Sequence, residues 1–289
     1  MLNRTLLILA LCAIAAPVLP QDSRPVRIVV PWPPSGNVDI TARTLQPALA
    51  EVLGQPVIVE NRAGAGGRIG TEAVAKATPD GAMLLLGSSG TITAGPAVWK
   101  TVNFDPLKDF IAIGPIQSVP IVLTVAPKTP VSTYQEFVSL AKSRAGGVSI
   151  ASAGNGSSNH LAIELLMRQA HLQLLHVPYK GSGPALTDLL GSQVDSMMDQ
   201  LTASIGYIRD GRLRPLAISS LKRSPQLPEV PTLDELGVPN IHATFWHGIW
   251  VPKGTPPEVI ARLDAAIVDA LADRQVQQRF RDVDRKSVV

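Results

Sequence analysis

Two loops rich in glycine and serine carry residue types that could bind an anion. Residues 31–39 read Pro-Trp-Pro-Pro-Ser-Gly-Asn-Val-Asp, and residues 152–160 read Ser-Ala-Gly-Asn-Gly-Ser-Ser-Asn-His. Each loop follows an apolar run and opens a run of helical period, so its backbone N–H groups would point from a helix N-terminus toward a ligand. Gly36 allows close backbone approach, while Asp39 could cap the helix or accept hydrogen bonds from a ligand. Two such loops facing each other would hold a carboxylate without an arginine, although an ordinary capped turn is the alternative for each.

Other candidate motifs do not fit their patterns. The glycine-rich residues 61–70 place Ile69 where a dinucleotide fingerprint requires its third glycine, and they follow the second expected strand rather than the first. Neither a Walker A motif nor a Gly-x-Ser-x-Gly elbow occurs in the sequence. The five histidines show no metal-ligand spacing, so we expect no metal and no cofactor. Ser157 or Ser158 with His160 leaves a periplasmic hydrolase or lyase open as an alternative, because sequence cannot show how these groups are arranged.

Short apolar runs alternate with stretches of helical length or period along the chain. This alternation favours βαβ units and mainly parallel sheets with helices on both faces, which defines an α/β protein. At about 150 residues per domain, two sheets fit the length better than one. We expect strands at residues 26–30, 57–59, 83–86, 111–113, 121–125, 148–151, 174–177 and 216–219, and helices at residues 39–52, 71–77, 133–143, 159–170 and 184–190.

The composition is that of a globular protein and sets nucleic acid aside as a partner. Of the 289 residues, 45% are hydrophobic and 17% are charged, which is too apolar for a disordered chain. The formal net charge of +3 is small, and no run of lysine and arginine or basic-aromatic motif appears. We therefore expect no nucleic-acid binding.

The first twenty residues have the pattern of a signal peptide. One positive charge, Arg4, precedes an apolar run over residues 6–16, which is shorter than the roughly 20 residues that cross a bilayer. The single cysteine, Cys12, lies inside this segment. The mature chain would have no thiol, which excludes disulfides and cysteine nucleophiles and suits an oxidising periplasm. The sequence therefore predicts export to the periplasm.

Several motifs together resemble the Bug family, the periplasmic receptors of tripartite tricarboxylate transporters. The resemblance extends from about residue 26 to residue 276, and its motifs come in the family's order. They lie at residues 28–39, 59–67, 78–81, 105–110, 156–162, 177–181, 223–232 and 251–257.

The resemblance implies a two-domain periplasmic binding protein of the Venus-flytrap type. Domain 1 would comprise residues 21–102 and 220–289, and domain 2 residues 103–219. Such a protein closes on a small organic carboxylate and delivers it to integral membrane permease subunits, and we expect a monomer. The residues that the resemblance assigns to ligand binding are Trp32, Pro33, Ser35, Gly36, Asp39, Ser88, Ser89, Ser157, Ser158, His160 and Asp199.

Three departures from the family pattern bear on these expectations. Ser35-Gly36 stands where relatives have two glycines, and Gly95-Pro96 stands where an Asn-Pro is common, so pocket shape and ligand would differ. The acidic Asp39 and Asp199 favour a mono- or dicarboxylate over a bare tricarboxylate anion. Residues 282–289 look foreign to the family, and we expect them to be disordered or poorly packed and domain 1 to be less stable.

A second alternative to the transport function is a sensor. Such a protein would bind the same ligand and report its occupancy to a membrane signalling partner.

Overall fold

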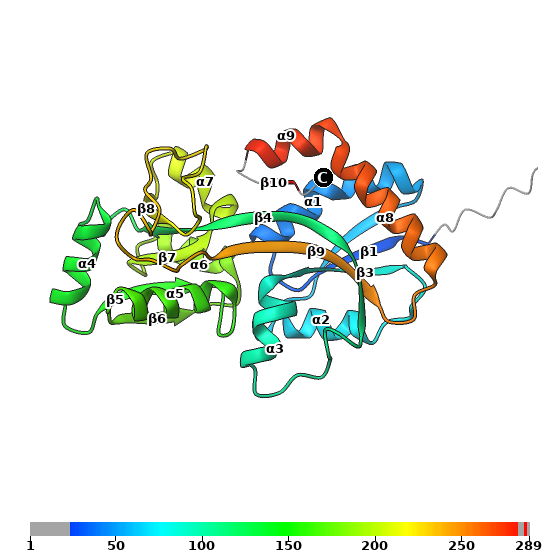
Figure 1. Ribbon diagram of the computed structural model, residues 1–289, viewed down its shortest axis with the longest axis horizontal. Helices are drawn as coiled ribbons and strands as arrows, with labels where there is room; N and C mark the ends of the chain where they lie inside the picture. The colour runs from blue at the N-terminus through cyan, green and yellow to red at the C-terminus, as the bar shows by residue number, and fades with distance from the viewer. Residues whose placement is uncertain (1–23, 283–285, 288–289) are drawn as a thin grey trace, which may run out of the picture.

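The computed structural model describes residues 24–282 and 286–287, which form two α/β lobes (Figure 1). The lobes lie side by side along the long axis of the molecule, and the strands β4 (Phe110–Val125) and β9 (Thr244–Pro252) run from one lobe to the other. The expected signal peptide, residues 1–20, lies outside the described residues. Among the helices of the described residues, none combines the length and the hydropathy that a membrane span requires.

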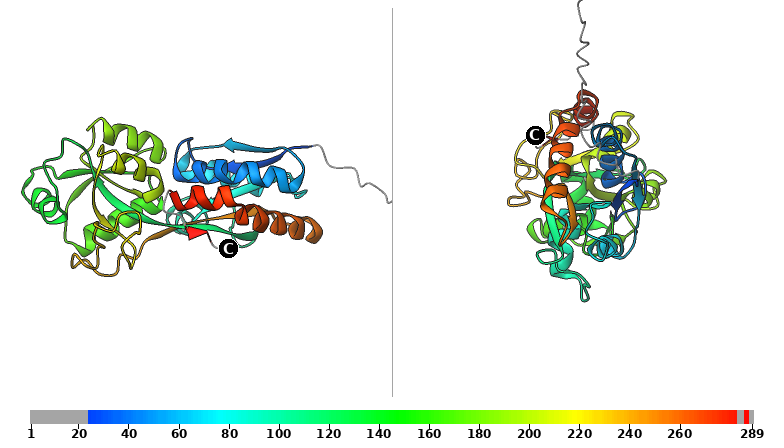
Figure 2. Two further views of the ribbon diagram at one scale, coloured as in Figure 1. Left: turned by 90° about the horizontal axis from the view of Figure 1, so that it is seen from above. Right: turned by 90° about the vertical axis from the view of Figure 1, so that its right-hand side faces the viewer.

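Lobe one holds the first three strands and the last helices of the described chain. Its elements are β1 (Val26–Val30), α1 (Asn37–Leu53), β2 (Val57–Asn61), the short turn η1 (Ala65–Gly67), α2 (Arg68–Ala75), β3 (Met83–Ser88), the π-helical turn η2 (Ser89–Ala94), α3 (Gly95–Val98), α8 (Pro257–Ala272), α9 (Arg274–Asp282) and β10 (Lys286–Ser287). Its sheet has the order β2-β1-β3-β9-β4, in which β1 pairs parallel with β2 and β3, and β9 runs antiparallel to β3 and β4. Figure 2 shows α1, α8 and α9 next to one another on this lobe.

Lobe two is built from the middle of the chain in the same way. Its elements are α4 (Tyr134–Ser143), β5 (Val148–Ser152), α5 (Ser158–Gln169), β6 (Leu174–Pro178), α6 (Ser182–Leu190), β7 (Ser196–Gln200), α7 (Leu201–Arg209) and β8 (Arg214–Ile218). Strand β5 pairs parallel with β6 and β7, while the end of β4 pairs antiparallel with β7 and β8. The expected α/β class is therefore confirmed. Each lobe has a parallel three-stranded core, and the strands shared between the lobes add antiparallel pairs.

Helix α1 illustrates how the sequence positions the first candidate loop. Its apolar residues Val38, Ala42, Leu45 and Leu49 recur at helical spacing and are buried against the sheet of lobe one and against α8. The helix ends at Gly54, whose φ of 64° is a left-handed conformation that glycine adopts without a steric penalty. Because this face is anchored in the core, the N-terminus of α1 and the loop before it are held at the edge that faces lobe two.

The strands that connect the lobes differ from the sequence expectation. Strand β4 is continuous where two separate strands, 111–113 and 121–125, were expected, and β9 was not expected at all. Gly114 and Pro115 are residues that usually end a strand, so the sequence indicates two strands here. The register of β4 against β9 shifts at these residues, and this irregular pairing accommodates them within one strand. The pairing of β4 changes from β9 to β7 and β8 between Pro120 and Ile121.

The pairing and packing also bear on the domain limits. Residues up to Pro120 pair within the sheet of lobe one, whereas Leu233, Val238 and Ile241 belong to a core cluster of lobe two. We therefore propose domain limits near residues 120 and 243, in place of the limits at 102 and 219 that the sequence suggested.

The C-terminal residues pack against lobe one. Helix α9 buries Val276 and Phe280, each no more than 3% exposed, in the core cluster that also holds α1 and α8. Lys286 and Ser287 pair antiparallel with Ser118 and Gln117 of β4. The expectation of a disordered or poorly packed segment over residues 282–289 is therefore wrong for Lys286 and Ser287, because β4 offers a free edge that these residues extend. Residues 283–285 and 288–289 lie outside the described part.

Candidate functional site

The loop between β1 and α1 is fixed by Asp39. The carboxylate of Asp39 accepts hydrogen bonds from the Ser35 backbone N–H at 2.9 Å, from Asn61 Nδ2 at 2.9 Å and from Arg43 Nε at 3.0 Å. Ser35 has a φ of 66°, a left-handed conformation that is uncommon for a residue with a side chain. The bond to its N–H holds this strained turn in place. Asp39 therefore braces the loop from inside lobe one.

The loop between β5 and α5 is fixed by Ser157 and His160. The Ser157 hydroxyl donates to the Gly154 carbonyl at 2.7 Å and caps α5 by accepting from the His160 N–H at 3.2 Å. His160 Nδ1 accepts from the Gly156 N–H at 3.2 Å. The His160 ring stacks on His176, with centroids 4.2 Å apart. Burial, with a smaller contribution from His160, lowers the pKa of His176.

Among the described residues, neither Ser157 nor Ser158 donates a hydrogen bond to the His160 imidazole. A serine nucleophile must give its proton to the imidazole, yet the Ser157 proton goes to a carbonyl and His160 Nδ1 is engaged by a backbone N–H. The other ring nitrogen, Nε2, lies 3.3 Å from Glu164. Ser158 instead faces lobe one, where its hydroxyl lies 3.0 Å from that of Ser89.

The lobes are in contact in this structure, around the two candidate loops. Besides the Ser89–Ser158 pair, Thr202 of α7 donates a hydrogen bond to the side-chain oxygen of Asn37 at the start of α1. Gly181, just before α6, lies so close to Pro33 that a β carbon there would be 2.5 Å from Pro33 Cδ. These contacts define a closed arrangement.

A small cavity lies between the closed lobes. It has a volume of about 20 Å³ and is lined by Trp32, Gly36, Asn37, Val38, Ala153, Asn159, Ser182, Gln200 and Phe245. Room of this size suits about one water molecule. In the described part of the chain, the N-termini of α1, α5, α6 and α7 all reach this cavity. None of the described residues that line the cavity is charged. Its attraction for an anion would therefore come from the backbone N–H groups and dipoles of these helix N-termini.

Asp199 lies behind two of the residues that line the cavity. It is fully buried, and its Oδ1 accepts from Asn159 Nδ2 at 2.9 Å and from Ser182 Oγ at 2.7 Å. Its Oδ2 has no hydrogen-bond partner among the described residues. Burial raises the pKa of Asp199 to about 6, against the opposing effect of hydrogen bonds from Ser182, the Gln200 N–H and Asn159. The site therefore contains an acid that changes charge in a mildly acidic range.

The structure separates the expected site residues by their position. Trp32 and Gly36 line the small cavity, Pro33 packs against Gly181, and Ser89 and Ser158 bridge the lobes beside it. The remaining expected residues hold the surrounding loops or lie behind the lining, and their role as ligand contacts stays a prediction. They are Ser35, Asp39, Ser88, Ser157, His160 and Asp199.

The sequence analysis did not assign four polar residues of the cavity lining to ligand binding, namely Asn37 and Asn159 of the two recognised loops and Ser182 and Gln200. Ser182 opens α6 after a strand and a glycine, and Gln200 immediately precedes α7, so both positions repeat the strand-to-helix pattern that identified the first two loops. That shared pattern is the signal that could have found them. Among the described residues, no cluster of three histidine, cysteine, aspartate or glutamate side chains is placed to hold a metal ion.

Two α/β lobes joined by connecting strands, with a small cavity between helix N-termini, define a two-domain solute-binding protein of the periplasmic binding protein fold. The family model described as "Tripartite tricarboxylate transporter family receptor" matches residues 41–288. The chain belongs to this receptor family, as the resemblance to the Bug proteins implied.

Relatives and solved structures agree with this assignment. Protein BugT of Bordetella pertussis is 40% identical over 275 residues, which is 94% of this chain and 84% of BugT. The structure of MatC from Rhodopseudomonas palustris with bound malate is 34% identical with a TM-score of 0.87, over 91% of this chain and 90% of MatC. A second R. palustris protein, solved with adipate, is 33% identical with a TM-score of 0.88, over 92% of this chain and 89% of that protein.

Proposed function

We propose that the protein captures a small organic carboxylate between its lobes and delivers it to the permease subunits of a tripartite transporter. The observation that carries this proposal is the meeting of four helix N-termini at one cavity, among the described residues, without a charged side chain in its lining. Backbone N–H groups at helix N-termini favour an anion, and a carboxylate can accept from several of them at once.

The size of the closed cavity adds a mechanistic requirement. At about 20 Å³ the cavity cannot admit a carboxylate of several heavy atoms while the lobes remain in contact. The lobes must therefore part, and the strands β4 and β9 that connect them are the elements that would bend. A ligand that contacts both lobes would then stabilise a closed form in which the lobes lie farther apart than in the structure described here. This ligand-bound form is the one that a permease would recognise.

The ligand class follows from the lining and from the relatives. Malate and adipate, bound in two related structures, are both dicarboxylates. In this chain the buried Asp199 lies behind the cavity, and its negative charge would oppose a highly charged ligand. A dicarboxylate is therefore the class that we propose, with binding rather than catalysis as the activity.

Export is a separate part of the proposal. We propose that a signal peptide within residues 1–20 is removed by cleavage, and that the mature protein acts as a monomer in the periplasm. Cell fractionation and N-terminal sequencing of the expressed protein test this. Recovery of an intact N-terminus from the cytoplasm would contradict it.

A thermal-shift screen tests the binding function. The mature protein is heated with malate, succinate, adipate and benzoate, and with the neutral amide of each compound as its control. A ligand at one hundred times its Kd stabilises the folded state by about 2.7 kcal/mol, or roughly 5–10 °C for a protein of this size. We expect at least one acid to raise the melting temperature while its amide does not. Equal effects of acids and amides, or no effect of any compound, would contradict carboxylate binding.

A further inference from the structure

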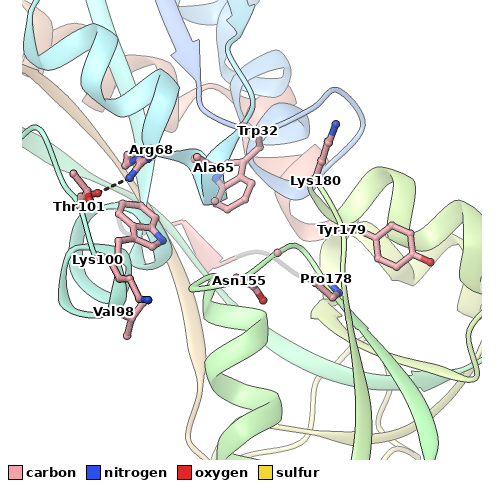
Figure 3. Close-up of a pocket in the computed structure, with 15 residues that line it drawn as sticks. Trp32, Ala65, Arg68, Val98, Lys100, Thr101, Asn155, Pro178, Tyr179 and Lys180 are labelled. Atoms are coloured by element: carbon pink, nitrogen blue, oxygen red, sulfur yellow. Dashed lines mark hydrogen bonds between the residues drawn. The ribbon is translucent and has the colours of Figure 1, made fainter.

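The lobes also meet outside the region of the candidate loops. Beside Trp32 they stay apart around a space of about 660 Å³, where residues 98–101 of lobe one face residues 178–180 of lobe two (Figure 3). Elsewhere, the C-terminal end of α9 in lobe one lies beside lobe two (Figure 1), and hydrogen bonds from α7 and from the loop after β8 connect the lobes there. The residues that form these bonds line neither this space nor the small cavity.

Two hydrogen bonds from lobe two end on backbone carbonyls in the last turn of α9. Arg209 Nη1, at the end of α7, donates to the Asp282 carbonyl at 2.9 Å. Gln226 Nε2, in the loop after β8, donates to the Arg281 carbonyl at 2.7 Å. The last four carbonyls of a helix have no partner inside it, and the helix dipole makes this end negative, so a guanidinium and an amide donor suit it. We call these two bonds the latch.

The donors of the latch are held by the core of lobe two. Helix α7 buries Leu201 and Ile205 in one core cluster, and the segment that carries Gln226 buries Leu227 and Val230 in the same cluster. Because such a core is closely packed, both donor segments move together with lobe two.

The acceptors of the latch are held by lobe one. Phe280, directly before the two acceptor residues, and Val276, one turn earlier, are buried in the core of lobe one. Beyond the helix, Lys286 and Ser287 pair with β4 within the sheet of lobe one. Donors and acceptors therefore belong to different lobes. A motion that separates these two surfaces by about 1 Å lengthens both bonds beyond hydrogen-bond distance.

We propose that the latch holds the ligand-free protein closed and thereby slows the entry of a ligand. Arg209 and Gln226 are then positioning residues, which set the ratio of closed to open protein from outside the cleft. The small cavity of the closed form, about 20 Å³, has no room for a carboxylate of several heavy atoms, so the open form is the one that admits it. The part of this inference that concerns ligand entry rests on the proposed function, whereas closure can be measured without a ligand.

The expected size of the effect follows from the exposure of the two bonds. Both are open to solvent, where one hydrogen bond shifts an equilibrium by about two- to threefold. Loss of both should raise the ratio of open to closed protein by about three- to tenfold. When the form that admits ligand is a minor fraction, the observed association rate is proportional to that fraction. The double variant Arg209→Ala with Gln226→Ala should therefore bind ligand about three- to tenfold faster.

The distance between two spin labels, measured by electron paramagnetic resonance, reports closure without a ligand. Leu107→Cys in lobe one and Leu175→Cys in lobe two supply the labelling sites, since both leucines are more than half exposed. The only cysteine of the sequence, Cys12, lies in the expected signal peptide and so does not interfere in the mature protein. We expect the latch variant to gain population at longer distances, by the factor given above.

A matched control removes the same two residue types from another part of lobe two. Arg168→Ala on α5 with Gln135→Ala on α4 replaces an exposed arginine and an exposed glutamine that lie outside the latch. This control should leave both the label distances and the association rate unchanged. An equal change in the control and in the latch variant would overturn the proposal, because the effect would then not depend on the latch.

Stopped-flow mixing with malate and with adipate measures entry, with tryptophan fluorescence as the signal because Trp32 lines the small cavity. Faster association in the latch variant, together with longer label distances, would support the proposal. Unchanged distances and an unchanged association rate would overturn it. Longer distances with an unchanged rate would show that the latch governs closure and would contradict its role in entry. If neither acid binds any of the proteins, the proposed function fails, and the label distances alone decide whether the latch holds the lobes closed.

Discussion

Replacement of Asp199 by asparagine tests the electrostatics of the buried site most sharply. The pKa of this fully buried acid is raised from the ordinary value of 3.8 to about 6. In the folded state Asp199 thus holds its proton at pH values at which the unfolded chain has lost it. The stabilisation from this protonation is complete below pH 3.8 and is lost as the pH rises through 6.

The magnitude follows from the difference between the two pKa values. At about 1.4 kcal/mol per pKa unit, the gap between 3.8 and about 6 corresponds to roughly 3 kcal/mol, of which about 2 kcal/mol develops between pH 7 and pH 4. No discount for solvent screening applies, because the side chain is fully buried. Relative to Asp199→Asn, which cannot ionise, the original protein should therefore gain about 2 kcal/mol as the pH falls from 7 to 4.

Urea unfolding of both proteins at pH 4, 5, 6 and 7 measures this difference. All other titrating groups contribute equally to the two proteins and cancel in the comparison. Asp264→Asn, at an exposed position on α8, serves as the control and should show a much smaller dependence on pH. A difference between the original protein and Asp199→Asn that stays constant with pH, or that grows in the opposite direction, would refute the reasoning.

Three other substitutions and a pH series follow from the same contacts. Asp39→Ala should lower the free energy of unfolding by about 2 kcal/mol in urea, since it removes the acceptor of the partly buried donors Ser35 N–H and Asn61 Nδ2; an unchanged midpoint would contradict the bracing role. Gly181→Ala should weaken carboxylate binding at least about tenfold in calorimetry, because a β carbon meets Pro33 as the lobes close and the φ of 140° disfavours alanine; unaltered affinity would show that this contact is dispensable. Phe280→Ala should cost about 3–5 kcal/mol in urea unfolding, as expected for a buried aromatic side chain, and a loss below 1 kcal/mol would mean that α9 is not part of the core. Carboxylate affinity should rise between pH 7 and pH 5, as Asp199 gains its proton, and this rise should be absent in Asp199→Asn.

The parts of the fold that were predictable from sequence are those in which local signals agree. The β-branched run at residues 26–30, the proline-rich loop and the apolar period of α1 specify a strand, a turn and a helix without reference to the rest of the chain. The same holds for β5 and α5. These local units located both loops that meet at the interface.

The connecting strands could not be predicted in this way. In β4, Gly114, Pro115 and Pro120 are residues that end strands elsewhere, and they are tolerated here because irregular pairing with β9 accommodates two of them. In β9, Gly248 sits within an aromatic sequence. A β carbon at Gly248 would lie within 2.9 Å of both the Trp250 ring and the Gly114 carbonyl. The contact with Gly114 joins residues more than a hundred positions apart, so no local pattern indicates it.

The residues of the candidate site also divide into those that a local sequence pattern predicts and those that depend on distant parts of the chain. Trp32 and Gly36 were predictable because they belong to a loop with a recognisable pattern, and both line the small cavity. The bracing role of Asp39 depends on Arg43, one helical turn away on α1, and on Asn61 of β2, which only the folded lobe brings to the carboxylate. The position of Ser182 at a helix N-terminus follows the local strand-to-helix pattern, but its place beside Gly36 of lobe one depends on the contact between the lobes.

We expect the carboxylate to bind between the lobes at the N-terminus of α1, beside Gly36. Gly36 has an ordinary φ of −80°, and a β carbon there would point into the interface at 4.0 Å from Ser182 Cβ. Gly36→Leu would therefore fill the small cavity without straining the backbone. Gly206→Leu, at an exposed position of α7 with open space around it, is the matched control.

Calorimetric titration of a dicarboxylate into the original protein, Gly36→Leu and Gly206→Leu tests this binding position. We predict binding to the original protein and to Gly206→Leu with equal affinity, and loss of binding by at least about one hundredfold in Gly36→Leu. Equal affinity in all three proteins would contradict the account, because the ligand would then bind elsewhere.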